Sequence, residues 1–441
     1  MIWVTPHLLV PMHGLGGAAD LPIPAPFAIL GGAATLAVSC VVLFAAWRTP
    51  RFATPEHTRV LPRGLASLLD SRTWVTGWRV VGLLLLGFML VPAFAGPDTL
   101  VNPVFGVVYV WLWVGIVPAS LLLGRVFRAL SPARSIVALL TRLTGGALYA
   151  PPIRLGFWPA AVMVFAFVWL ELVHPQAAYL GPVRLWFTVY FAVVVLGGVL
   201  FGERWIERCD PFEAYSTLVA HLSVWGRRHD GVRVWVSPLR HLASLQPERG
   251  LVALTAVLLG STAYDSFSSS VTWIRFTQSS EIPSVLLSTT CLVAWVAAVG
   301  VVFTLATTMI PAQDAPRSQL PALLAHSLVP IIVGYMVAHY LSYFVAQGQQ
   351  TLIQVSDPLG TGWNLFGTAS LTPNRWLAHH PTVLASVKVV AIVAGHVLGA
   401  VAAHDRALEL LRPRHHVVGQ LALMVVMVAF TYLGLLLLFS S

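Results

Sequence analysis

The stretch that decides the fold is VVGQLALMVVMVAFTYLGLLLLFS, residues 417–440. It contains no charged side chain. As an α-helix it is long enough to cross the roughly 30 Å hydrocarbon layer of a bilayer, which takes about 20 apolar residues. Comparable runs recur along the chain. Because a backbone exposed to lipid must satisfy its own hydrogen bonds, we expect an all-α integral membrane protein.

The recurring apolar runs predict about ten transmembrane helices within a single membrane domain. Of the 441 residues, 57% are hydrophobic and only 10% are charged, whereas soluble globular domains carry about 25% charged residues. An ordinary soluble protein is therefore excluded. The predicted spans are residues 27–47, 80–96, 104–123, 156–174, 184–202, 250–270, 285–308, 322–345, 382–404 and 417–440.

The arginines give these spans an orientation. Of 26 basic residues, 25 are Arg, and 22 of these fall in alternate loops, leaving only Arg184, Arg275 and Arg375 on the opposite side. An excess of basic residues marks cytoplasmic loops, so both termini are expected outside (N-out/C-out). This pattern explains the net charge of +9 as a topology signal. It predicts contact with the lipid bilayer and no binding of nucleic acid.

Three segments between the spans are too long for plain turns. On the cytoplasmic side, residues 125–145 and 205–245 mix apolar residues with Arg, and PFEAYSTLVAHLSVWGRR (211–228) is typical of an amphipathic helix on the membrane surface. On the outer side, residues 346–381 are polar and rich in Gly and Pro. Such a loop could be a lid or binding loop, or simply a solvated connection.

Ionisable side chains inside the predicted spans are the first functional candidates, because burying them in hydrocarbon is costly. Asp265, His339 and Lys388 lie five or six residues from the outer ends of their helices, and Glu171 and His174 close the outer end of another. At about 1.5 Å of rise per residue, the five groups share one layer roughly 5–10 Å below the outer surface. We expect a polar pocket that opens outward, with Tyr264, Tyr335, Ser342 and Tyr343 around it.

This layer allows several interpretations. Asp265 and Lys388 could neutralise each other, as buried charges usually must, and His339 could be a packing histidine bonded to a tyrosine. Alternatively, His339, Asp265, His174 and Glu171 could bind a divalent metal ion, zinc or copper, that activates a water molecule. The sequence contains no compact metal-binding motif such as HExxH.

His396 is a secondary metal-ligand candidate, deeper in its span. Gly395, Gly399 and Ala403 form a stripe of small residues beside it, which lets a neighbouring helix or a flat cofactor approach closely. Helix packing is the favoured interpretation. A haem held by His339 and His396 is disfavoured, because helical rise places His396 roughly 12 Å deeper.

Several segments resemble a known family. They are HGLGGAADLPIP (13–24), ERCDPFEAYSTLVAHLS (207–223), STAYDSFS (261–268), HYLSYFVAQGQQTLIQVSDPLGTGWNLFGTA (339–369) and GHVLGAVAAHDRALELL (395–411). The chain resembles, over nearly its whole length, an actinobacterial family of polytopic membrane proteins commonly labelled fenitrothion hydrolase. The resemblance implies a bacterial cytoplasmic-membrane protein that hydrolyses an organophosphorus ester. It supplies no catalytic residues.

Three functions follow as hypotheses. The first is a hydrolase of amphipathic esters, in which Asp265 and His339 bind the metal or act as acid and base and Lys388 stabilises negative charge on a phosphoryl oxygen. The second is a transporter or permease, in which the same groups form a substrate or proton path that continues past His396 to His404 and Asp405. The third is a membrane scaffold subunit for partner proteins.

Overall fold

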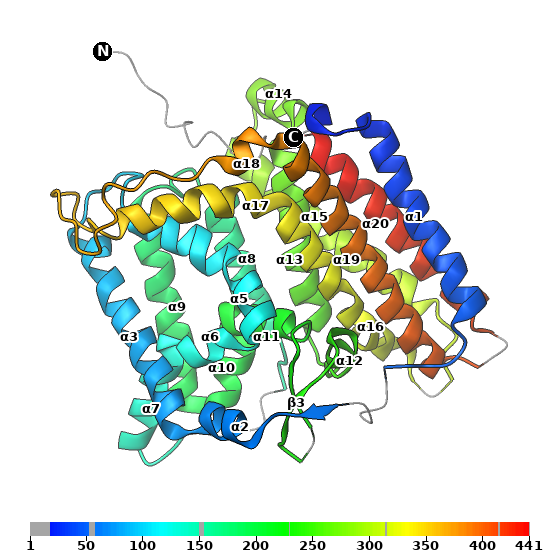
Figure 1. The fold of residues 1–441 in the computed structure, drawn as a ribbon, viewed down its shortest axis with the longest axis horizontal. Coiled ribbons are helices and arrows are strands. Elements are labelled where there is room, and N and C mark those ends of the chain that lie inside the picture. The colour runs from blue at the N-terminus through cyan, green and yellow to red at the C-terminus, as the bar shows by residue number, and fades with distance from the viewer. Residues whose placement is uncertain are drawn as a thin grey trace.

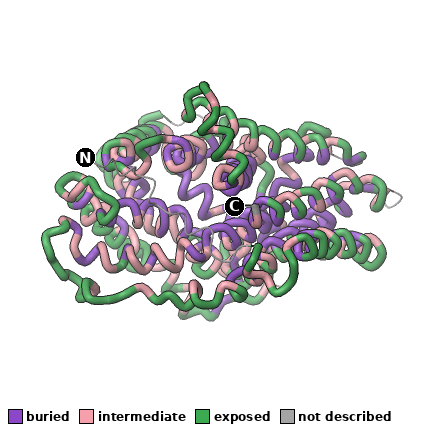
Figure 2. Tube along the Cα trace, turned by 90° about the horizontal axis from the view of Figure 1, so that it is seen from above, coloured by how far each residue is buried: buried purple, intermediate pink, exposed green. Residues whose placement is uncertain are grey.

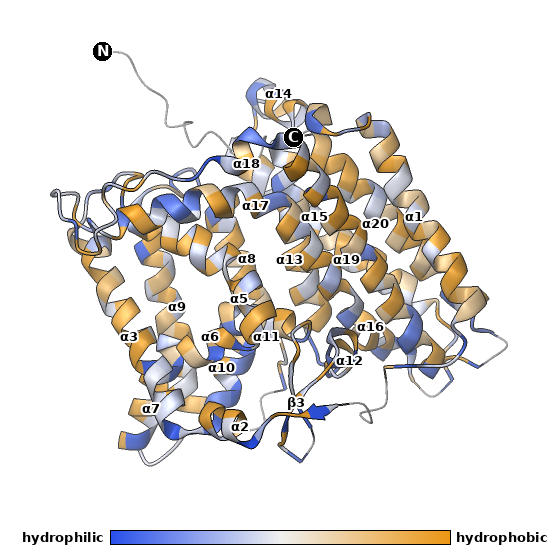
Figure 3. Cartoon of the chain, in the orientation of Figure 1, coloured by the Kyte–Doolittle hydropathy of each residue, from blue (hydrophilic) through white to orange (hydrophobic). Residues whose placement is uncertain are grey.

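A computed structural model describes residues 18–52, 58–149, 154–228, 230–313, 315–412 and 415–440. Over these residues the chain is helical, apart from one small three-stranded antiparallel sheet in the order β1-β3-β2. The strands are β1 Arg59–Val60, β2 Trp225–Arg227 and β3 Arg233–Trp235. The sheet lies at the lower edge of the molecule in Figure 1, where hydrophilic residues gather (Figure 3). The all-α membrane architecture is confirmed.

Two groups of helices stand side by side (Figure 1). The first helix group comprises α2 Arg63–Asp70, α3 Arg72–Ala95, α4 Pro103–Phe105, η4 Gly106–Val114, α5 Ile116–Leu123, α6 Val126–Leu130, α7 Pro132–Leu143, α8 Trp158–Leu172, α9 Leu180–Phe201, α10 Glu203–Cys209 and α11 Pro211–Ala220.

The second helix group comprises the remaining helices of the described chain. They are η2 Ala18–Asp20, α1 Ala25–Ala46, α12 Pro238–Ala243, α13 Leu251–Ser268, α14 Val271–Ser279, α15 Ser284–Thr308, η5 Arg317–Gln319, α16 Leu320–Leu324, η6 Ala325–Ser327, α17 Leu328–Gln354, α18 Trp376–His379, α19 Pro381–Leu410, η8 Val418–Gln420 and α20 Leu421–Ser440.

Eight helical segments of the described chain are long and apolar enough to cross a membrane. A ninth candidate is a bent pair, Pro103–Val114 with Ile116–Leu123, whose two parts meet at 44°. The predicted span 156–174 corresponds to α8, which has only 15 residues. Each predicted span therefore coincides with a helix, but eight or nine of them, and not ten, have the length and composition of a membrane span.

Burial separates the central helices from the peripheral ones. In α13 and in the segment Arg317–Gln354, which ends with α17, 78% of the most apolar window is buried inside the protein, against 11% in α3 and α15. Figure 2 shows buried residues concentrated in the middle of the molecule and exposed residues around it. In a bilayer the exposed apolar side chains of α3 and α15 face lipid. The protein core, and any site inside it, therefore lies around α13 and α17.

Two of the three long segments between the predicted spans, 205–245 and 346–381, differ from the expected structure. The segment around α11 was expected on the membrane surface, but this is wrong: nine of the ten residues of α11 are buried, and the chain after it turns into β2. The outer segment 346–381 begins as helix, because α17 continues to Gln354. The rest of that segment contacts α3, where the Phe366 and Phe88 rings lie 5.9 Å apart.

Candidate functional site

The site is built around His339, which hydrogen-bonds through both ring nitrogens. On α17, its Nε2 lies 2.9 Å from Asp265 Oδ2 and its Nδ1 lies 3.0 Å from Ser266 Oγ, both on α13. Tyr340 donates a 2.5 Å hydrogen bond to the same Asp265 oxygen, and Tyr335 donates one of 2.9 Å to Ser266 Oγ. The result is one continuous hydrogen-bonded chain between two packed helices.

The donors in this chain run in a single direction. With a proton on Nε2 and none on Nδ1, neutral His339 donates to Asp265 and accepts from Ser266. Tyr335 then donates to Ser266, so that every hydroxyl is used. Asp265 is the common acceptor at the end of the chain. Its side chain is 11% exposed, whereas that of His339 is 3% exposed.

A second carboxylate, Glu171, lies near the first. It sits at the end of α8 and interacts electrostatically with Asp265. Its Oε2 atom is buried and has no hydrogen-bond partner within the described structure. We refer to Glu171, Asp265, Ser266, His339 and Tyr340 as the acid–imidazole cluster.

Two further buried polar atoms lie near Glu171. Tyr215 OH makes no hydrogen bond within the described residues, whereas Trp113 Nε1 interacts with the Tyr340 side chain. The Trp113 and Tyr215 rings are 5.2 Å apart between centroids, and Tyr215 interacts electrostatically with Glu171. Buried polar groups are nearly always satisfied in folded proteins. Glu171 Oε2 and Tyr215 OH are therefore the two unsatisfied groups of this region.

Trp113 reaches the cluster because its helix is irregular. Residues Gly106–Val114 form a π-helix, a rare geometry that is common at functional sites. Gly115 then follows, and the helix bends by 44° into α5. Tyr109 and Trp113 lie on this π-helix, and both pack against Phe167 of α8. The cluster is thus assembled from α8 of the first helix group and from α13 and α17, and Trp113 of η4 and Tyr215 of α11 lie next to it.

The structure brings together Asp265, His339 and Glu171, but not all five predicted groups. His174 lies in the turn after α8, where its Nδ1 accepts a hydrogen bond from the backbone of Gln176. Lys388 on α19 interacts electrostatically with Asp20, since η2 packs against α19. Its charge partner is therefore Asp20 and not, as one interpretation expected, Asp265.

His396 and Asp405, which were expected deeper in α19, make contacts that stabilise the fold. His396 Nδ1 bonds the Ile392 carbonyl, and its Nε2 lacks a partner within the described chain. The small residues beside it pack directly on α17: a Cβ on Gly395 would lie 2.6 Å from the Pro330 carbonyl oxygen. This close packing favours helix contact over a flat cofactor. Asp405 accepts hydrogen bonds from Trp47 and from the chain after α1.

The metal hypothesis gains no support from this geometry. Among the described residues, no group of three or more His, Cys, Asp or Glu side chains is placed to hold a metal ion. His339 instead uses both ring nitrogens in hydrogen bonds to Asp265 and Ser266. The proton donors and acceptors of the cluster, and not a coordination sphere, are what the structure offers for chemistry.

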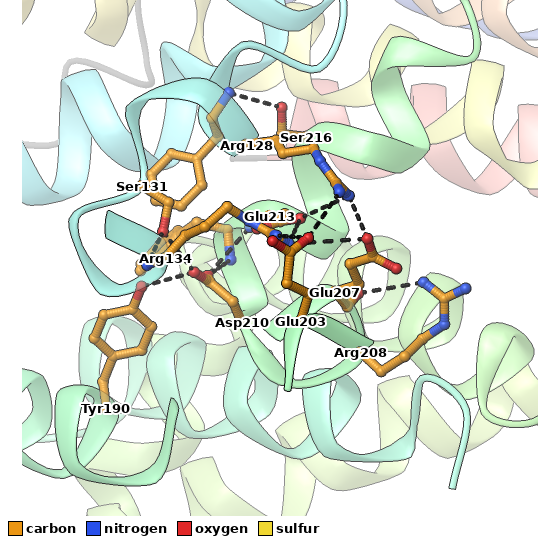
Figure 4. Close-up of polar contacts among 12 residues, drawn as sticks. Arg128, Ser131, Arg134, Tyr190, Glu203, Glu207, Arg208, Asp210, Glu213 and Ser216 are labelled. Atoms are coloured by element: carbon orange, nitrogen blue, oxygen red, sulfur yellow. Dashed lines mark hydrogen bonds and ion pairs between the residues drawn. The ribbon is translucent and has the colours of Figure 1, made fainter. Parts of the chain in front are cut away.

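A second polar network holds α11 in place (Figure 4). Arg134 on α7 binds Glu213 through two hydrogen bonds of 2.9 and 2.6 Å and also reaches Glu203 at 3.0 Å. Both Arg134 and Glu213 are buried. Arg128 pairs with Glu207 at 2.5 Å. Bidentate arginine–carboxylate pairs fix geometry, so this network anchors the helix that presents Tyr215 to the cluster.

Asp210 caps that helix. Its Oδ1 accepts from the backbone N–H groups of Phe212 and Glu213, and its Oδ2 accepts from Tyr190 OH at 3.0 Å and Ser131 Oγ at 3.3 Å. Burial, followed by the nearby charge of Glu213, raises the pKa of Asp210 to about 7. The cap can therefore change charge near neutral pH.

Sequence reasoning missed several of these residues. Ser266 was not singled out because hydroxyl residues are frequent in helices, although its position next to Asp265 was a usable signal. Trp113 was not singled out either, since nothing in an apolar run predicts π-helical geometry. Tyr215 was missed because its helix was expected on the membrane surface. Comparison with protein-family models, with curated proteins and with solved structures gives no match to this chain.

Proposed function

We propose that this protein is a proton-coupled transporter of small amphipathic solutes, in which the acid–imidazole cluster carries the coupling proton. The observation that carries the proposal is the position of the cluster. Two carboxylates and an imidazole lie buried where the two helix groups meet. Ionisable groups inside membrane segments mark proton and substrate paths, and transporters bind substrate between helix bundles that move relative to one another.

The proton would change the state of the cluster as follows. When His339 is neutral, Ser266 donates to its Nδ1. When His339 is protonated, both ring nitrogens donate. Ser266 must then accept from Nδ1 and turn its own O–H toward another acceptor. Protonation thus reorients a hydroxyl on α13 in response to a histidine on α17, which couples the two helices to the proton.

The polar atoms near Glu171 support a solute site. Tyr215 offers a hydroxyl and Glu171 a carboxylate oxygen, and neither atom has a partner in the described chain. The aromatic rings of Trp113, Phe167 and Tyr215 pack against one another beside them, so a solute would enter as the two helix groups move apart. Aromatic walls with a few polar groups are typical of sites for amphipathic small molecules.

The bent membrane-spanning segment also supports the transporter proposal. Discontinuous membrane helices are typical of transporter binding sites, and the π-helix η4 with its 44° bend contributes Trp113 to this one. The bend also lies next to α17, where Trp111 Nε1 donates to the Gly348 carbonyl. We further propose the N-out/C-out orientation that the arginine distribution predicts. The membrane we propose is the bacterial cytoplasmic membrane, as the family resemblance implies.

Proteoliposomes test the proposal. The purified protein is reconstituted with a pH-sensitive dye inside, and a panel of small aromatic acids and phosphate esters is added outside. We expect at least one solute to evoke proton movement, and Asp265→Asn to abolish it. Glu281→Gln removes an exposed carboxylate just before the start of α15 and serves as the matched control. Absence of flux with the whole panel, or equal flux in Asp265→Asn, would contradict transport.

A specific observation favours ester hydrolysis as a second candidate. Ser266, His339 and Asp265 are bonded in the order of a serine hydrolase triad, with the two ring nitrogens exchanged: Ser266 bonds Nδ1 and Asp265 bonds Nε2. The order agrees with the hydrolase label of the family that the sequence resembles. Ser266 is fully buried and accepts a hydrogen bond from Tyr335, so a hydrolase would need the site to open before attack. For this reason we place it second.

Ser266→Ala separates the two functions. A nucleophilic serine predicts labelling by a fluorophosphonate probe and release of nitrophenol from an aryl phosphotriester, both lost in Ser266→Ala. Proton coupling predicts no labelling and only a partial loss of flux, because His339 keeps its bond to Asp265. Rapid labelling of the unaltered protein at Ser266 would reverse the order of the two candidates.

A further inference from the structure

A large groove lies between α8 of the first helix group and helices of the second, toward the end of α8 and α13 opposite to the acid–imidazole cluster. It has a volume of about 1150 Å³ and is bounded by α8, α13, α15 and the start of α16. Its walls are apolar and include Val162, Phe165, Val257, Val296 and Val301. Pockets for drug-sized ligands measure roughly 300–1,000 Å³, so the groove has room for a larger, mostly apolar molecule.

One end of the groove is polar. Glu248, Arg249, Ser318 and Gln319 line it, at the end where α8 and α13 begin and α15 ends. In the proposed orientation this is the cytoplasmic side. Trp158, the first residue of α8, also lines this end, and tryptophan is enriched where membrane meets water. The groove therefore runs from the lipid headgroup level into the acyl-chain region.

The charge at the polar end is positive. Arg208 binds Glu248 through two hydrogen bonds of 2.7 and 2.5 Å, which neutralises its carboxylate. Arg249 is exposed, and no salt bridge to it is found within the described residues. Arg317, also exposed, directly precedes Ser318. Two arginines and a hydroxyl are thus available beside an apolar groove.

From this combination we infer that the groove binds one anionic phospholipid of the cytoplasmic leaflet. The phosphate lies at Arg249 and Ser318, and the acyl chains lie between α8, α13 and α15. The charge complementarity selects the headgroup, since basic residues at the membrane surface attract anionic lipids. The apolar walls select a lipid over a soluble phosphate compound.

Native mass spectrometry of the purified protein tests this inference. Phosphatidylglycerol and phosphatidylcholine with identical acyl chains are offered in equal amounts. We expect one phosphatidylglycerol to be retained in preference, and Arg249→Ala to reduce the preference by about fivefold, as expected for one basic residue near a membrane surface. Arg142→Ala, at another exposed arginine between spans, should leave it unchanged.

A second pair of variants tests the apolar part. Ala297→Phe places a ring in the groove that Ala297 lines and should lower retention of both lipids. Ala294→Phe, three residues earlier on α15 and exposed outside the groove, should not. Equal retention of the two lipids, or an unaltered preference in Arg249→Ala, overturns the inference. If inorganic phosphate alone displaced the bound lipid, the inference that the bound phosphate belongs to a lipid would be overturned.

Discussion

His339 joins two groups that handle a proton differently. Asp265 accepts from its Nε2 and from Tyr340, whereas Ser266 can either donate to Nδ1 or accept from it. Asp265 thus stabilises a proton gained by the imidazole, and the Ser266 hydroxyl reorients when that proton is gained. Glu171 adds a second carboxylate whose Oε2 lacks a partner in the described structure. This arrangement is what we expect of a proton-binding centre.

Asp210 provides a residue-scale prediction of pH dependence. Its pKa is 3.8 in an unfolded chain and about 7 in the folded protein. Between these values the folded state keeps a proton that the unfolded state has lost, so the stability contributed by Asp210 falls as pH rises through this window. Asp210→Asn cannot ionise and should melt with a weaker dependence on pH across it.

Differential scanning fluorimetry in detergent measures this effect. Asp230→Asn, at an exposed carboxylate paired with Arg228, is the matched control and should keep the slope of the unaltered protein. If Asp210→Asn and Asp230→Asn show identical slopes through the window from acidic to neutral pH, the raised pKa of Asp210 is refuted.

The residues of the cluster were partly predictable. Asp265, His339 and Glu171 were identified because each is an ionisable group in an apolar run, and helical rise placed them at one depth. Lys388 met the same criterion, yet it interacts with Asp20. Depth along a helix does not say which way a side chain points around it. Tyr215 could not be found in this way, since its place depends on the tertiary burial of α11.

At the scale of elements, α11 is the helix whose position matters most for the site. It presents Tyr215 to the cluster and is held by the Arg134–Glu213 pair at its start. Removing one member of a buried ion pair leaves the other uncompensated, which costs about 3–5 kcal/mol. Arg134→Ala should therefore lower the free energy of unfolding by about this amount.

The comparison variant for Arg134→Ala is Arg228→Ala. Arg228 binds Asp230 at 2.6 Å, but both side chains are largely exposed, and exposed ion pairs contribute little to stability. Denaturant unfolding of the two variants should show a large loss for Arg134→Ala and no measurable loss for Arg228→Ala. Similar stabilities would mean that the network does not anchor α11.

The contact between α17 and α19 gives a prediction about packing. A Cβ on Gly334 would lie 2.4 Å from the Ala391 carbonyl oxygen, whereas a Cβ on Gly31 of α1 would meet nothing within 4 Å. Overpacking a tight contact costs about 1–3 kcal/mol, and replacing an open helical glycine by alanine gains up to about 1 kcal/mol. Thermal melting should fall in Gly334→Ala and hold or rise in Gly31→Ala.

Hydropathy predicted where the helices are, but not their irregularities. The uncharged composition of residues 106–114 indicates a span equally well as α-helix or π-helix, because hydropathy counts apolar side chains without regard to their direction around the helix axis. The extension of α17 to Gln354 was missed since polar Gln residues and nearby Gly resemble a loop. Trp111 of η4 donates a hydrogen bond to the Gly348 carbonyl of α17. This contact stabilises the helical conformation in a stretch whose composition favours coil.

At the scale of the whole molecule, the cluster lies where the two helix groups meet, and α17 connects them (Figure 1). A site shared by two bundles can open toward either side when one bundle moves against the other. The proposed orientation places the Arg134–Glu213 network toward the cytoplasm and the cluster toward the outer side. Movement of α11 would then link the two.

Infrared difference spectroscopy of the reconstituted protein tests the central claim, that the buried cluster binds and releases a proton, without knowledge of the solute. Spectra are recorded as the pH is lowered and raised again. The account predicts a reversible imidazolium band of His339 that is lost in Asp265→Asn, because Asp265 accepts from its Nε2, and that is retained in Glu281→Gln. A spectrum of Asp265→Asn that matches the unaltered protein over the whole pH range would contradict it.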